Sequence, residues 1–120
     1  MNSLGHVVGR LGFAGSPASD GFFYDGQSMV DLGTLGFGNA AAIAINDKDQ
    51  IVGYASMADG RELATLFTTG KGFVALDKLV DELDDWQLNE ALSINDHGVI
   101  IGIGTRRDGT HAFMLTPIAD

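Results

Sequence analysis

The chain has 120 residues, of which 45% are hydrophobic and 19% are charged, values that fit one globular domain and exclude a wholly disordered chain. Its 16 acidic and 7 basic residues give a formal charge of −9, which would repel the phosphate backbone of nucleic acid and argues against a nucleic-acid partner. Without cysteine, disulfides and cysteine-ligated zinc are excluded. No stretch approaches the roughly 18 apolar residues of a membrane span, and the first residues do not form an export signal.

One unit is written nearly three times along the chain, and each copy contains an asparagine turn followed by two β-branched residues and a glycine. Asn46 follows Asn2 by 44 residues (from 2 to 46), and Asn95 follows Asn46 by 49 (from 46 to 95). Periods of this size belong to propeller blades and related arrays, in which one unit cannot bury its apolar face alone. We therefore expect a single β-repeat domain over 1–120, composed of a partial repeat 1–41, a full repeat 42–90 and a partial repeat 91–120.

Short antiparallel strands separated by glycine-containing turns are expected throughout. In chain order, these strands cover 28–32, 42–45, 50–55, 63–67, 72–76, 91–94, 99–105 and 111–115. Asn2, Asn46 and Asn95 begin the turns of the repeated hairpins, where a side-chain oxygen bonds the nearby backbone. Gly53 and Gly102 lie inside expected strands and indicate a β-bulge or the close approach of another backbone.

One segment departs from the strand pattern. Apolar residues at 76, 79, 80 and 83 follow one helical face, so a short helical insertion is expected near 76–88. The predicted fold is therefore all-β, with tandem four-stranded antiparallel β-repeats, β-propeller-like, plus this insertion. Because an unclosed array leaves sheet edges unpaired, self-association is expected, with a dimer as the leading arrangement. A closed monomer resembling a β-trefoil or β-prism is the alternative.

Several motifs occur together in one order: Met29-Val30-Asp31-Leu32-Gly33-Thr34-Leu35-Gly36, the Ala-x-x-Ile-Asn stretch from 42, and His111-Ala112-Phe113-Met114-Leu115-Thr116-Pro117. In these motifs the chain resembles the HAF repeat family of bacterial proteins, over nearly its whole length. The resemblance implies a β-propeller-like repeat and an extracellular or periplasmic location, and it implies no reaction. The triplet is intact only at 111–113, and the ungapped counterpart in the middle copy is 62–64.

The candidate chemical sites are few. Asp47 and Asp49 resemble part of a calcium loop, but the glycine and the distant glutamate of such loops are missing, so turn formation is the favoured interpretation. None of the three histidines is paired with another at helical spacing, and no Gly-x-Ser-x-Gly nucleophile elbow occurs. We therefore predict no enzymatic activity and no cofactor.

An acidic cluster beside the single tryptophan is the most distinctive surface candidate. Trp86 with Asp84 and Asp85 could hold a sugar or a basic protein. The competing interpretation is a solvated acidic face with Trp86 filling the core.

The leading functional hypothesis is a non-enzymatic scaffold or recognition module that self-associates to complete its sheet array, with a protein or glycan as a further partner. The alternative is a carbohydrate- or divalent-cation-binding domain that uses the loop face. A hydrolase with a site shared between copies and an acidic inhibitor of a basic partner are the remaining hypotheses.

Overall fold

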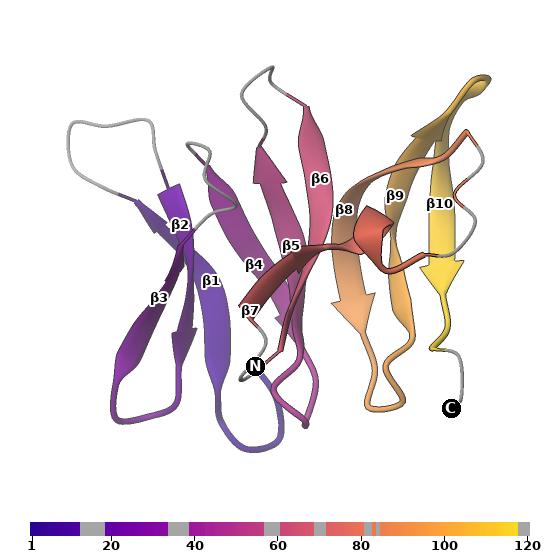
Figure 1. Ribbon diagram of the computed structural model, residues 1–120. Coiled ribbons are helices and arrows are strands. Elements are labelled where there is room, and N and C mark those ends of the chain that lie inside the picture. Colours follow the sequence, from indigo (N-terminus) through magenta and orange to yellow (C-terminus); the bar gives the residue numbers. More distant parts are fainter. Residues whose placement is uncertain are drawn as a thin grey trace.

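The computed structural model describes residues 1–12, 19–33, 39–56, 61–68, 72–80, 83 and 85–117. This part of the chain is all-β, as predicted, and forms three antiparallel sheets that lie side by side in chain order (Figure 1). The elements are β1 (Val7–Gly12), β2 (Ser19–Tyr24), β3 (Met29–Gly33), β4 (Ala40–Ile45), β5 (Ile51–Ser56), β6 (Glu62–Thr68), β7 (Gly72–Ala75), the 3-10 turn η1 (Leu76–Lys78), β8 (Gln87–Ile94), β9 (Ile100–Arg106) and β10 (Gly109–Leu115).

Each sheet is a meander in which neighbouring strands are also consecutive in the chain. The first sheet is β1-β2-β3, the middle sheet is β4-β5-β6-β7, and the third is β8-β9-β10. Within the described residues, four strands are therefore present in the middle sheet and three in each outer sheet. The repeat boundaries expected at 41/42 and 90/91 fall inside β4 and β8, because apolar residues such as Ala40 and Leu88 extend these strands toward the N-terminus.

The strand register aligns the three sheets residue by residue. Gly9, Gly53 and Gly102 pair with Phe22, Thr65 and Phe113 respectively. The counterpart of the triplet His111 to Phe113 is therefore 63–65, one residue later than the ungapped comparison placed it. The shift arises because four residues separate the partners Thr105 and Thr110, whereas five separate the partners Ser56 and Glu62.

The predicted role of Gly53 and Gly102 at bulges is confirmed. The pairing of β4 with β5 shifts between Ala42 and Ala44, and that of β8 with β9 shifts between Leu88 and Glu90 and again between Ala91 and Ser93. A Cβ atom at Gly53 would lie 2.0 Å from the carbonyl oxygen of Ala41, and one at Gly102 would lie 2.1 Å from that of Glu90. Only glycine permits this approach of the neighbouring strand.

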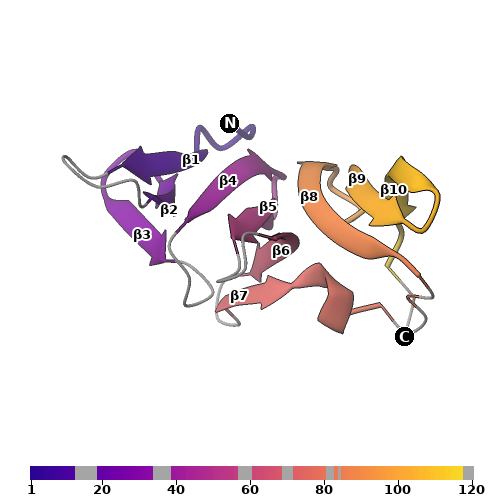
Figure 2. The same cartoon turned by 90° about the horizontal axis from the view of Figure 1, so that it is seen from above.

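The core is divided into two apolar clusters, one at each contact between sheets. Ile51 and Val52 are adjacent in β5 and point to opposite faces, so they are 2% and 0% exposed in different clusters. Seen from above, β4 lies beside the first sheet and β8 lies beside the middle sheet (Figure 2). The middle sheet is therefore buried on both faces, which explains why β5 is apolar at consecutive positions.

Among the described residues, the helical insertion predicted near 76–88 consists of short hydrogen-bonded turns. The 3-10 turn η1 ends at Lys78. A second turn is closed by a backbone hydrogen bond of 2.9 Å from the N–H of Trp86 to the carbonyl oxygen of Leu83, and β8 begins at Gln87. Residues 81, 82 and 84 lie outside the described residues. Leu76 begins η1, as the helical pattern allowed, and also fills the core at 1% exposure. No helix in the described part of the chain has the length and apolar character needed to cross a membrane.

Candidate functional site

The three asparagine turns have one geometry, which confirms the predicted turn chemistry. In each turn the asparagine Oδ1 accepts hydrogen bonds from the backbone N–H groups two and four residues later, at 2.9–3.1 Å. The fourth turn residue has a positive φ, 80° at Gly5, 57° at Asp49 and 82° at Gly98. Asp49 is the non-glycine among them, and aspartate tolerates this conformation better than most residues do.

The same asparagines also connect one turn to the next. Asn2 Nδ2 donates to the carbonyl oxygen of Asn46, and Asn46 Nδ2 donates to that of Asn95, both at 2.9 Å. In parallel, the backbone N–H of Ser3 donates to Asp47 Oδ1, and the N–H of Asp47 donates to Oδ1 of the following repeat's aspartate, Asp96, both at 2.7 Å. We call this pair of repeated bonds the asparagine ladder.

The ladder ends at the third turn, because within the described residues no further turn accepts a hydrogen bond from the side-chain amide of Asn95. Asn46 is 3% exposed because the third turn covers it, whereas Asn95, its counterpart in the third turn, is exposed. These connections were not predicted. The available signal was the aspartate that follows Asn46 and Asn95 at the same register, where Ser3 follows Asn2.

The two weak calcium candidates are held by protein groups. Asp49 Oδ1 accepts from Asn2 Nδ2 at 2.8 Å and lies 2.7 Å from Nδ1 of His6. The backbone N–H of Ser3 lowers the pKa of Asp47, with a smaller contribution from the Ser3 side chain. Over the residues that the structure describes, no three histidine, aspartate or glutamate side chains converge as metal ligands would.

Trp86 lies against the third sheet. Its ring packs edge-on against Phe113, with centroids 6.4 Å apart, and Arg106 lies 5.2 Å from its ring centroid. Arg106 Nε also donates to Asp85 Oδ1 at 3.0 Å, and the backbone N–H of Arg107 donates to Asp85 Oδ2 at 3.1 Å. These two donors, Arg107 first, lower the pKa of Asp85.

The structure thus brings Trp86 and Asp85 together around the guanidinium group of Arg106. Asp84 lies outside the described residues. The contacts of Trp86 with the core favour its packing role.

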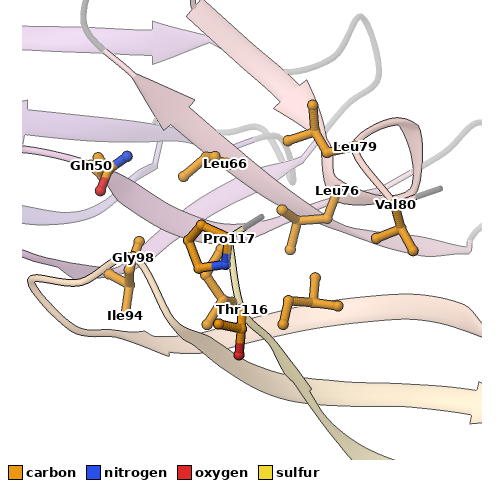
Figure 3. A pocket seen from close by; sticks show the side chains of 11 residues that line it. Gln50, Leu66, Leu76, Leu79, Val80, Ile94, Gly98, Thr116 and Pro117 are labelled. Atoms are coloured by element: carbon orange, nitrogen blue, oxygen red, sulfur yellow. The ribbon is translucent and has the colours of Figure 1, made fainter. Parts of the chain in front are cut away.

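A cavity of about 370 Å³ opens between the middle and third sheets (Figure 3). Its walls are mostly apolar: Leu66, Leu76, Leu79, Val80, Ile94, Ile100, Leu115 and Pro117, with Gln50, Gly98 and Thr116. Gln50 Oε1 accepts from Asn46 Nδ2 at 2.8 Å, so its amide nitrogen is left as a donor at the cavity wall.

The first contact between sheets has larger side chains at the equivalent positions, which explains why the cavity lies at the second contact. Phe23 pairs with Val8 as Leu66 pairs with Val52, so Phe23 is the first-contact counterpart of Leu66. In the same way, Phe67 pairs with Ile51 as Leu115 pairs with Ile100, so Phe67 is the counterpart of Leu115. The turn positions of Gln50 and Gly98 are occupied there by His6 and Asp49, which bond each other. Smaller residues at the second contact leave space.

The outward face of the third sheet is apolar and uncovered. Ile101 and Met114 are 48% and 67% exposed, and Ile103 and Ala112 are exposed beside them. We call these four residues the docking face. By register, Ile101 corresponds to Val52, which the third sheet buries completely.

The first sheet carries the matching outward face. Met1 and Tyr24 are exposed and Val7 is partly buried. These residues correspond to Ile45, Phe67 and Ile51, which the middle sheet packs against the first sheet.

Searches of protein-family models, of curated proteins and of solved structures found no match to this chain. The resemblance to the HAF repeat family therefore stays a prediction.

Proposed function

We propose that this chain is a non-enzymatic β-repeat module, a scaffold or recognition unit that self-associates to complete a β-propeller-like array of sheets. The observation that carries the proposal is the docking face, because Ile101 is half exposed where its counterpart Val52 is fully buried. Contiguous exposed apolar surface is typical of an interaction site on a protein of this size. Two copies would bring together six sheets, within the four to eight blades of known propellers.

The measured mass in solution tests this proposal. We expect light scattering after size exclusion to give a multiple of the 12.6 kDa chain mass. A strictly monomeric protein at millimolar concentration would contradict self-association. Secretion into the periplasm or medium, which the HAF resemblance implies, belongs to the same proposal and is checked by fractionating the native host.

The non-enzymatic part of the proposal is supported by what the polar side chains do. His6 and Asp49 bond each other at 2.7 Å beside the ladder, and His111 lies 2.7 Å from Asp108 on the third sheet. Asp85 is held by Arg106 and Arg107. These groups are engaged in turn and sheet contacts rather than directed at a shared point.

A second candidate function is the binding of a small apolar molecule, which the cavity beside Gln50 favours. The test is fluorescence of anilinonaphthalene sulfonate with the native protein and with Leu66→Phe, which places at the cavity the side chain found at the first contact. We expect the dye signal to fall in Leu66→Phe and to persist in Leu4→Phe, an exposed control. Equal signals in all three proteins would contradict a ligand site in the cavity.

The alternatives of a carbohydrate or a divalent cation bound on the loop face are tested separately. A cation held by Asp47 and Asp49 would raise the melting temperature by mass action, and a chelator would lower it.

A further inference from the structure

We propose that self-association is head-to-tail: the docking face of one copy packs against the outward face of the first sheet in a second copy, and the asparagine ladder continues from Asn95 of the one to Asn2 of the other. This inference rests on the proposed self-association and names the two surfaces that meet. It also sets the direction of assembly, since the two surfaces are different.

The two contacts inside the chain use the same positions, and these define what a third contact needs. At the first contact, Val8 and Phe23 pack against a cluster that includes Ile45, Ile51 and Phe67. At the second contact, the cluster contains Val52 and Leu66 together with Ile94, Ile100 and Leu115, which are the register counterparts of Ile45, Ile51 and Phe67. One sheet therefore contributes a β-branched residue of the strand that follows its asparagine turn. The next sheet contributes the residue before its own asparagine turn and the first residue of the strand after that turn.

Each end of the array presents one half of such a contact. The third sheet offers Ile101 and Met114 at the positions of Val52 and Leu66. The first sheet offers Met1, Val7 and Tyr24 at the positions of Ile45, Ile51 and Phe67. Both halves are apolar and exposed at most of these positions, although the chain carries a charge of −9.

The ladder gives the contact its polarity. Each asparagine amide donates forward to the carbonyl oxygen of the next asparagine, so the donor left over in the described residues is Asn95 Nδ2. The matching acceptor is the carbonyl oxygen of Asn2, which accepts the N–H of Gly5 at 3.1 Å and has a second lone pair, as Asn46 and Asn95 use theirs in the ladder. Ser3 occupies the place of Asp47 and Asp96, and its hydroxyl can accept from the N–H of Asp96 as those carboxylates accept from the preceding turn. A donor end and an acceptor end make a heterologous contact, in which rotation either closes a ring or extends a fibre.

The test uses two variants that each block one surface. Ile101→Arg places a charge on the docking face, and Tyr24→Arg places one on the first sheet. We expect each variant alone to self-associate at least tenfold more weakly than the native chain, and an equimolar mixture to form a one-to-one complex through the remaining intact pair of surfaces. Sedimentation equilibrium measures both. Ile43→Arg is the matched control, since Ile43 is 43% exposed and belongs to neither surface.

The fold of each variant is checked by far-UV circular dichroism, and Met114→Arg replaces Ile101→Arg if that variant unfolds. A native chain that self-associates while the mixture stays uncomplexed would overturn the head-to-tail contact and leave the proposed function standing. A monomeric native chain would overturn both. Asn95→Asp keeps the turn acceptor but removes the forward donor, so we expect it to weaken association about fivefold, by the worth of one hydrogen bond.

Discussion

The substitution Asn46→Asp isolates the forward bonds of the asparagine ladder. The shape of the side chain and the Oδ1 acceptor of the turn are retained, while the Nδ2 donor becomes an oxygen. That atom would face two acceptors, Gln50 Oε1 and the carbonyl oxygen of Asn95, which Nδ2 reaches at 2.8 and 2.9 Å. The matched change is Asn95→Asp, in the same turn geometry at an exposed position.

The magnitude follows from counting the contacts that Asn46→Asp loses. Two hydrogen bonds are removed, each worth about 1 kcal/mol net, and a buried charge facing two oxygens adds about 1–3 kcal/mol. We expect the free energy of unfolding to fall by about 3 kcal/mol or more for Asn46→Asp. For Asn95→Asp we expect a change within about 0.5 kcal/mol, as for most exposed positions.

Urea unfolding measures both variants, at a protein concentration low enough for light scattering to give the monomer mass. Burial and the facing oxygens should raise the pKa of the new carboxyl, so its protonated form fits the fold better. The loss of stability should therefore be largest at neutral pH and shrink as the pH falls through the raised pKa. Equal losses at positions 46 and 95 would refute the ladder as a stabilising connection between sheets.

Three further predictions concern other positions. Trp86→Ala should lower the free energy of unfolding by about 2–3 kcal/mol in urea titrations, below the 3–5 kcal/mol of a fully buried aromatic, because Trp86 is half-buried; an unchanged value would instead support a binding surface. Thr65→Val should raise it by about 1 kcal/mol, because the Thr65 hydroxyl is buried without a partner among the described residues; a loss would reveal a hidden partner. The lowered pKa of Asp47 means that its stabilising contribution is present above the ordinary aspartate pKa and is lost as the pH falls below about 4. The urea midpoint of Asp47→Asn should therefore depend less on pH in that range than the midpoint of the native chain does. Parallel curves for the two proteins would contradict this.

Strands β3 to β10 lie close to the ranges predicted from the sequence, because their signals are local, whereas β1 and β2 were not among the predicted ranges. Asn turns, glycine-containing turns and β-branched runs act within a few residues, and the close approach at Gly53 follows from a glycine inside such a run. The helical insertion predicted near 76–88 ends before its expected limit because β8 pairing begins at Gln87 and includes Leu88. A spacing pattern does not reveal which competing tertiary contact will use the same apolar residues.

The candidate sites were less predictable, because their contacts join residues far apart in the chain. Asp85 contributes to an acidic run in the sequence, but folding places Arg106 against it. The one-residue shift of the 111–113 triplet likewise depends on the length of a hairpin connection, which an ungapped comparison cannot detect.

The repeat also explains why folding and the proposed association depend on the same kinds of contact. Val52 and Ile101 occupy one register position, yet one lies between two sheets and the other on the surface. Truncation of the Val52 side chain should therefore lower the free energy of unfolding of the monomer. Truncation of the Ile101 side chain should weaken self-association and leave the stability of the monomer unchanged. The same distinction applies to Asn46 and Asn95. If both members of each pair changed only monomer stability, the third sheet would end the array, and the docking face would be ordinary apolar surface.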